Sequence, residues 1–208
     1  MKIEIIENFF EKRHFEDLNN ITLKKINKGE ISVVHNEIVD DRIIVNNGIS
    51  EDLLIDLNRT YHEKAINILA KLCPEKVKLY EYSDFTIINT GSHYKFPIHD
   101  DTPNKLLSGV IYLSPAENTG TIFYKNKKGE NKKTIEWKKN RAVFFSRIER
   151  ETWHSYEGNG LENRTALIYN LMTNNIKKVY EIEKKNYLLG LLRWKLNPYL
   201  YHYFKINY

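Results

Sequence analysis

Apolar residues recur at helical spacing over one long stretch of the N-terminal half. The stretch opens at Ser50, a candidate N-cap, and Glu51 and Asp52 suit the positive end of a helix dipole. Pro74 ends it. The apolar positions lie mostly three or four residues apart, at Leu53, Leu54, Leu57, Tyr61, Ala65, Ile68, Leu69 and Leu72. The pattern predicts a helix between Ser50 and Pro74.

Shorter patterns precede this helix. Residues 2–6 alternate charged side chains with isoleucine, which is the period of a half-buried strand. Phe10, Phe15 and Leu18 lie near one face of a predicted second helix over 10–18. Residues 31–35 predict another strand, which makes His35 a strand or loop residue in this interpretation.

From Val77 onward the period changes to that of short strands. The runs are rich in β-branched and aromatic residues and are separated by turn material such as Asn118, 127–131 and 157–160. No helical pattern separates them, which favours an antiparallel sandwich or jelly roll over a parallel sheet. The predicted strands are 77–80, 85–88, 108–114, 119–124, 133–137, 142–146 and 165–171.

The helical period returns after Met172. Residues 180–203 mix leucine, tyrosine and tryptophan with lysine and arginine, and Pro198 is expected to break the helix. Such a segment is a candidate contact surface for a membrane or a partner, although covering the chain's own sheet is the commoner role. The predicted organisation is one domain over 1–208, with an N-terminal strand and helix layer (1–76), a jelly-roll core (77–173) and a C-terminal helical segment (174–208).

Bulk composition describes an ordinary globular protein and excludes several classes. Hydrophobic residues make up 41% of the 208 positions and charged residues 28%. The single cysteine, Cys73, excludes an internal disulfide and a cysteine-based zinc site. Together with the charged N-terminus and the lack of a long apolar run, this favours a cytoplasmic location. The net charge of +5 comes from lysines spread along the chain, which argues against a nucleic-acid-binding face.

The most informative stretch for chemistry is 93–101. His99 and Asp101 stand two residues apart, and on an extended segment such residues project to the same side, whereas Asp100 points away. An imidazole and a carboxylate on one face match part of the ferrous site made by two histidines and one carboxylate. His93 lies six residues before His99, and we expect it to line the entrance to the site and not to bind the metal.

The missing ligand and a cation follow later in the chain. Of the two histidines after Asp101, His154 comes after the predicted strand 142–146 and its short loop, and Arg164 comes ten residues beyond it. If Gly158-Asn-Gly160 forms a hairpin turn, His154 and Arg164 face each other on paired strands. A guanidinium placed there can grip a carboxylate through two hydrogen bonds.

His99-x-Asp101, then His154, then Arg164 resembles the pattern of the iron(II)- and 2-oxoglutarate-dependent oxygenases over about residues 77–173. The resemblance implies a double-stranded β-helix, in agreement with the strand pattern. It implies Fe(II) on His99, Asp101 and His154, and the distal carboxylate of 2-oxoglutarate on Arg164. It also implies O2 as a cosubstrate, with ascorbate as a further candidate cofactor.

Two further residues bear on the cosubstrate. Tyr112 looks like the tyrosine with which prolyl-hydroxylase-like members hydrogen-bond the same carboxylate, and the alternative is an ordinary core aromatic. Many members have Ser or Thr two residues after the arginine, but Ala166 stands there. A hydroxyl contact to the cosubstrate must therefore come from elsewhere, which strengthens the case for Tyr112.

The expected activity is oxidation of an unactivated C–H bond, most simply hydroxylation, with release of succinate and CO2. Asp101 argues against halogenation, because halogenating members usually lack the carboxylate. A small molecule or an exposed peptide side chain is the favoured substrate, and Lys95 and Arg147 are candidate contacts for an anionic one. Two alternatives stay open: a nucleic-acid dealkylase, against which stands the absence of a second arginine in 166–172, and a non-catalytic cupin-like binding module. The oligomeric state is open.

Overall fold

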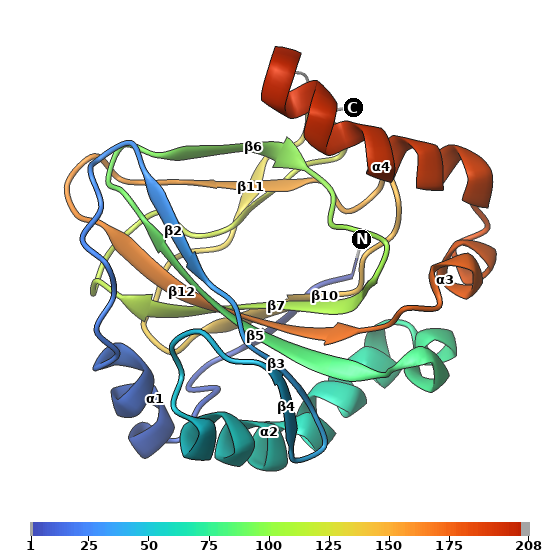
Figure 1. Cartoon of the computed structure of the whole chain (residues 1–208). Helices are drawn as coiled ribbons and strands as arrows, with labels where there is room; N and C mark the ends of the chain where they lie inside the picture. Colours follow the sequence, from blue (N-terminus) through green and yellow to red (C-terminus); the bar gives the residue numbers. More distant parts are fainter. Residues whose placement is uncertain (1, 205–208) are drawn as a thin grey trace.

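Two antiparallel sheets face each other across the interior of the protein, and helices cover the outer face of the larger sheet (Figure 1). The structure, a computed structural model, describes residues 2–204, and only the backbone of 197–204. In the described part the main sheet has eight strands in the order β1-β10-β7-β12-β5-β3-β4, with β2 also paired to β5. The second sheet has the order β6-β11-β8-β9. This is the double-stranded β-helix that the resemblance implies, and it agrees with the jelly roll that the strand pattern predicts.

The bounds of the strands show how the chain alternates between the sheets. The main sheet contains β1 (Glu4–Ile6), β2 (Ile31–Val34), β3 (Glu37–Val39), β4 (Arg42–Val45), β5 (Tyr82–Thr90), β7 (Lys105–Ser114), β10 (Ala142–Phe145) and β12 (Arg164–Met172). The second sheet contains β6 (Lys95–His99), β8 (Ile122–Phe123), β9 (Lys133–Thr134) and β11 (His154–Glu157). The N-terminal layer thus supplies four strands of the main sheet in addition to its helices.

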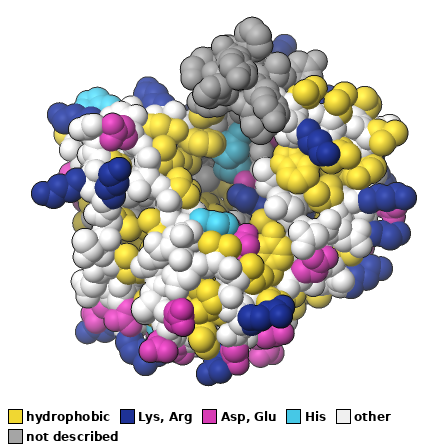
Figure 2. Space-filling model, in the orientation of Figure 1, with side chains coloured by type: hydrophobic (Ala, Val, Ile, Leu, Met, Phe, Trp, Pro, Cys, Tyr) yellow, Lys and Arg dark blue, Asp and Glu magenta, His cyan; other side chains and the backbone are white. Residues whose placement is uncertain are grey.

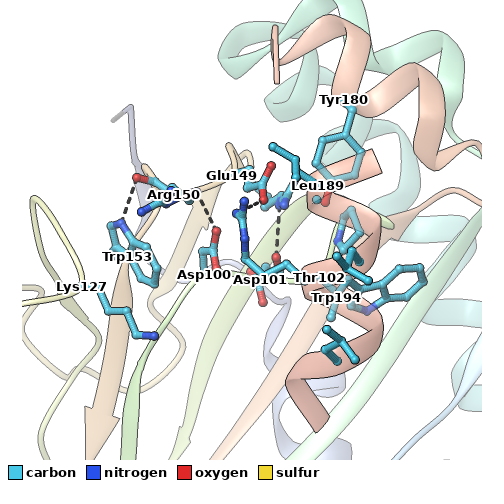
Figure 3. A pocket seen from close by; sticks show the side chains of 16 residues that line it. Asp100, Asp101, Thr102, Lys127, Glu149, Arg150, Trp153, Tyr180, Leu189 and Trp194 are labelled. Carbon is cyan, nitrogen blue, oxygen red and sulfur yellow. Dashed lines mark hydrogen bonds and ion pairs between the residues drawn. The ribbon is translucent and has the colours of Figure 1, made fainter. Parts of the chain in front are cut away.

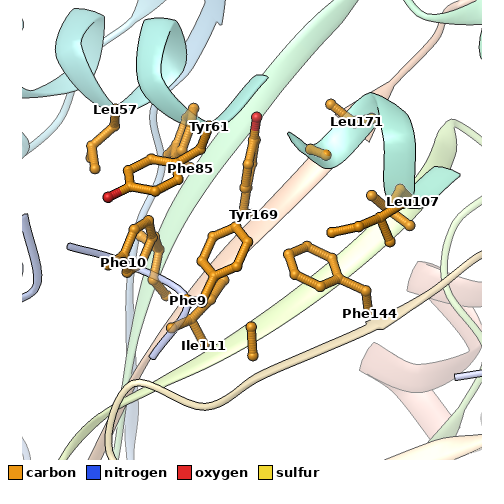
Figure 4. Packing of buried hydrophobic residues seen from close by; sticks show 14 of the residues in the cluster. Phe9, Phe10, Leu57, Tyr61, Phe85, Leu107, Ile111, Phe144, Tyr169 and Leu171 are labelled. Atoms are coloured by element: carbon orange, nitrogen blue, oxygen red, sulfur yellow. The ribbon is translucent and has the colours of Figure 1, made fainter. Parts of the chain in front are cut away.

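The larger of two hydrophobic clusters lies between the main sheet and the long helix that the sequence predicts. That helix is α2 (Glu51–Leu72), and Ser50 occupies its N-cap position without a capping side-chain hydrogen bond. Its buried face packs on the sheet together with the short α1 (Lys12–Asn19). Figure 4 shows the aromatic part of this cluster, in which Phe85 and Tyr169 stack with ring centroids 4.3 Å apart. This packing holds the main sheet in place, and the opposite face of the sheet borders the interior between the two sheets.

Three predictions about elements are wrong. Residues 77–80 are not a strand, because Pro74 opens the 3-10 helix η1 (Pro74–Leu79), whose first turn suits the fixed φ of proline. Pro198 does not break the C-terminal helix: after α3 (Ile176–Ile182), α4 runs over Tyr187–Phe204. Proline removes one hydrogen bond from a helix, and here the helix continues past it.

The third wrong prediction concerns the connection at 158–160. β11 and β12 are not a hairpin, because β11 pairs with β6 and β8, whereas β12 pairs with β5 and β7. The connection after Glu157 crosses from one sheet to the other. Gly158 permits the crossing, since a Cβ there would lie 2.1 Å from the carbonyl oxygen of Ser92.

Candidate metal and cosubstrate site

The described residues hold one cluster of three side chains that could bind a metal ion: His99, Asp101 and His154, with ligand atoms within 4.8 Å of one another. His99 ends β6, and His154 begins β11 directly opposite it in the register of the two strands. The two rings lie 4.2 Å apart between centroids. Asp101 follows β6 by two residues and completes the group, as the spacing predicts.

Backbone contacts orient both imidazoles in the same way. Nδ1 of His99 lies 3.0 Å from the carbonyl oxygen of Pro97, and Nδ1 of His154 lies 2.9 Å from that of Thr152. A carbonyl oxygen accepts only, so each Nδ1 carries a proton and each Nε2 is the nitrogen left for a metal ion. A hydrogen bond of this kind fixes the tautomer in metal-binding histidines. Burial, followed by the neighbouring His154, lowers the pKa of His99 to about 3, so this imidazole is neutral at physiological pH.

The carboxylate of Asp101 is held by two neighbours that the sequence analysis missed. Lys105 Nζ lies 2.8 Å from Oδ1, and the Ser108 hydroxyl donates to Oδ2 over 2.6 Å. Burial alone would raise the pKa of Asp101, but Lys105 and the two imidazoles hold it below its ordinary value. Asp101 is therefore a carboxylate. Each of its oxygens can accept a further partner, so a cation can bind there with both contacts in place.

Arg164 lies across the interior from the histidines, at the start of β12 in the main sheet. Only 3% of it is exposed, and its guanidinium lies 4.8 Å from the ring centroids of both Trp137 and Tyr156. Its Nη1 is buried without a hydrogen-bond partner among the described residues. Burial lowers the pKa of Arg164 to about 10, which leaves it cationic at neutral pH. A buried cation with an unused donor is costly unless an anion completes it.

One cavity of about 290 Å³ joins these groups. His99, Asp101, His154 and Arg164 all line it, together with Thr121 and the apolar side chains of Phe96, Val110, Phe145 and Ile168. Alternate residues of β12 face it, namely Arg164, Ala166, Ile168 and Asn170. The cavity thus has the Arg164 guanidinium at one end. The three potential metal ligands lie further along the direction of β12.

The structure places Tyr112 beside this cavity but not in its lining. Its ring stacks on Trp137 with centroids 4.4 Å apart, and its hydroxyl donates to Thr121 Oγ1 over 3.0 Å and accepts from the Thr121 amide. Thr121 itself lines the cavity. Tyr112 therefore holds a residue that lines the cavity. The missed residue Thr121 carries no sequence signal beyond its place in a predicted strand.

The other candidate residues lie outside this cavity. His93 is exposed and contacts the hydroxyl of Ser92 through its Nδ1 at 3.0 Å, and Lys95 is an exposed cation paired with Glu157 at 3.5 Å. Arg147 is buried, donates to the carbonyl oxygen of Asp101 over 3.1 Å and pairs with a Glu183 oxygen at 2.6 Å. It anchors the loop that carries Asp101.

A second, larger cavity of about 670 Å³ adjoins that loop (Figure 3). Asp100 points toward it and accepts a hydrogen bond from the Arg150 amide over 2.7 Å. Asp100 is thus not part of the candidate metal cluster, as the alternation along 99–101 predicts. Trp153 and the α4 residues Leu189 and Trp194 form apolar parts of its wall.

No family model matches the chain, and no curated protein matches it. Solved structures do. The chain superposes on a 2OG-Fe(II) oxygenase family oxidoreductase from Burkholderia pseudomallei with a TM-score of 0.58 and 14% identity, over 83% of this chain and 85% of the other. The fold is that of the 2-oxoglutarate oxygenases. A prolyl-4-hydroxylase from Pseudomonas putida gives a TM-score of 0.53 and 11% identity, over 83% of this chain and 93% of the other. A Trichoplax adhaerens prolyl hydroxylase, solved with a hypoxia inducible factor peptide, gives 0.54 and 14%, over 85% and 86%. The oxygenase fold is thus shared over most of the chain.

Proposed function

We propose that the protein is an iron(II)- and 2-oxoglutarate-dependent oxygenase. The observation that carries the proposal is that a buried, incompletely bonded arginine and a His-Asp-His cluster line the same cavity. A cluster of two histidines and one carboxylate is the ligand set typical of ferrous oxygenases. The unused donor of Arg164 calls for an anion within the cavity, and a dicarboxylate that also chelates the metal would meet both demands.

Each residue has a separate role in this proposal. His99 and His154 would bind Fe(II) through Nε2, Asp101 through its carboxylate, and Arg164 would hold the distal carboxylate of 2-oxoglutarate. When bound, Fe(II) with 2-oxoglutarate and O2 supplies oxidative decarboxylation to succinate and CO2 and the oxidising power for a C–H bond. Ser108 and Lys105 keep the Asp101 carboxylate in place, and the walls around Phe96 and Phe145 exclude water.

The hydroxyl contact that Ala166 cannot make falls to Thr121 in this proposal. Thr121 faces the cavity and Tyr112 holds it from behind with two hydrogen bonds. The role of Tyr112 is then to position Thr121. We further propose that the reaction is hydroxylation and that its prime substrate is a small molecule or a peptide side chain. The peptide bound to the Trichoplax hydroxylase supports a peptide as one of these two classes.

The proposal is tested by calorimetric titration of the metal-free chain, first with Fe(II) under argon and then with 2-oxoglutarate. Tight 2-oxoglutarate binding is expected only after the metal, and succinate release only when O2 is admitted. His154→Ala should abolish both steps. A folded chain that takes up neither Fe(II) nor 2-oxoglutarate would contradict the proposal and favour a binding module without redox chemistry.

The structure also bears on the expected lack of a transmembrane segment. In residues 2–204 no helix combines the length and the apolar character that a bilayer crossing requires.

A further inference from the structure

A row of four polar side chains runs across the main sheet at one level. Ser108 on β7, Asn170 on β12, Asp84 on β5 and Glu37 on β3 are successive register partners. Strands lie about 4.8 Å apart, so the row extends about 14 Å from Ser108 to Glu37. Its Ser108 end touches the metal ligand Asp101, and its Glu37 end is partly exposed.

The centre of the row holds an unsatisfied acceptor. Asp84 Oδ1 accepts from the Thr86 hydroxyl over 2.6 Å, and Oδ2 accepts from Asn170 Nδ2 over 2.6 Å. The second contact fixes the amide of Asn170, because only its nitrogen can donate to a carboxylate. Asn170 is 1% exposed, and its Oδ1 is buried without a partner in the described part of the chain. Such an acceptor is costly unless a ligand donates to it.

The charges around this acceptor favour a cation. His35 lies between two carboxylates, with Nδ1 3.1 Å from Asp84 and Nε2 3.0 Å from Glu37. The hydrogen bond to Asp84 is the main reason that the pKa of His35 rises to about 9, so His35 is positive at neutral pH. Two carboxylates and one imidazolium leave one negative charge. Lys105 also lines the cavity and interacts with Asp84 at longer range, but its direct partner is Asp101 at 2.8 Å.

The same end of the cavity opens to the surface. At this end the side chains of His35 and Glu37 are 42% and 20% exposed, whereas Ile31 and Val33 of β2 line the cavity at the level of Arg164 and Ala166. Figure 2 shows a hollow on this face, with histidine side chains in and beside it and acidic side chains close by. A small molecule can therefore reach Asp84 and Asn170 from solvent, and Arg164 lies toward the opposite end of the cavity.

We propose that Asp84 and Asn170 bind a positively charged nitrogen of the prime substrate, which is a small aliphatic amine. Its ammonium group donates to Asn170 Oδ1 and to the Asp84 carboxylate, and its carbon chain extends toward His99, Asp101 and His154. The inference rests on the proposed function in one respect, since it takes these three residues as the place of oxidation. It names the substrate class that the same cavity selects.

The test is a calorimetric titration of the metal-free chain at pH 7 with n-butylamine, alongside n-butanol and butyrate as neutral and anionic probes of similar shape. The amine is expected to bind at least about tenfold more tightly than n-butanol, since an ammonium–carboxylate hydrogen bond is charge-assisted. Asp84→Asn keeps the size of the side chain and removes its charge. It should reduce amine binding about tenfold and leave n-butanol binding unchanged. Glu117→Gln, at an exposed carboxylate elsewhere, is the matched control and should change neither.

Amine binding no tighter than that of n-butanol would overturn the inference, and so would unchanged amine binding in Asp84→Asn. If Asp84→Asn does not fold, Glu37→Gln at the open end of the row takes its place. It should weaken amine binding about threefold, and an unchanged value would overturn the inference in the same way. Because the chain is metal-free here, the outcome is independent of oxygenase activity. Amine binding without Fe(II) or 2-oxoglutarate binding would contradict only the proposed function.

Discussion

Replacing Arg164 by methionine tests whether this arginine binds a ligand or stabilises the fold, because the two roles predict opposite effects on the stability of the ligand-free chain. Burial moves the pKa of Arg164 from 12.5 to about 10, which corresponds to about 3 kcal/mol of unfavourable free energy for the cation. Its contacts with Trp137 and Tyr156 return about 2 kcal/mol in total. Methionine fills similar volume without charge. We therefore expect Arg164→Met to leave the free energy of unfolding of the ligand-free chain unchanged, or to raise it by about 1 kcal/mol.

The same change should be severe for the cosubstrate. Removing one partner of a buried, hydrogen-bonded charge pair costs about 3 kcal/mol, which is more than a hundredfold in the dissociation constant of 2-oxoglutarate. Urea denaturation gives the first quantity, and calorimetry on the Fe(II)-loaded chain under argon gives the second. Arg59→Met, at an exposed arginine paired with Asp41, is the control and should leave 2-oxoglutarate binding unchanged.

The refuting result is the reverse combination. A loss of more than about 2 kcal/mol in unfolding free energy with unchanged 2-oxoglutarate affinity would make Arg164 a structural residue. The assignment of the cosubstrate end of the cavity would then be wrong.

Three further predictions follow from particular contacts. The pKa of His35 should be near 9 by NMR titration and fall toward 6.5 in Asp84→Asn. Because the folded value is the higher one, the stabilisation from this contact is fully present below about pH 6.5 and is lost as pH rises through 9. The loss in the free energy of unfolding should be about 1 kcal/mol, since solvent screens this partly exposed ring. Glu183→Gln leaves two buried cations without their carboxylate and should lower the free energy of unfolding by about 3 kcal/mol in urea. Thr121→Val should weaken 2-oxoglutarate binding about fivefold by calorimetry, and Tyr112→Phe should weaken it by a smaller factor. A larger loss of affinity in Tyr112→Phe than in Thr121→Val would mean that Tyr112 contacts the cosubstrate itself.

The local part of the site could be read from the sequence because it depends on short-range geometry. His99 and Asp101 fall on one side of an extended segment whatever sheet it joins, and the structure brings both to His154. The helix between Ser50 and Pro74 could be predicted equally well, since the spacing of its apolar residues is a local property. The fold class followed from the same kind of pattern.

Pairing between distant segments was not accessible in this way. Alternation tells which residues share a face of a strand, but not which sheet the strand enters. His154 and Arg164 were therefore expected on paired strands, whereas they lie in opposite sheets and face each other across the cavity. The row from Ser108 to Glu37 draws on four strands from separate parts of the chain, so no sequence window contains it.

The most direct test of the central claim is an anaerobic titration of the chain with Fe(II) and 2-oxoglutarate, followed by visible absorption. The proposed site predicts a weak charge-transfer band that forms only when both are present and that is absent in His154→Ala. A well-folded chain that shows no such band at saturating Fe(II) and 2-oxoglutarate would contradict the account.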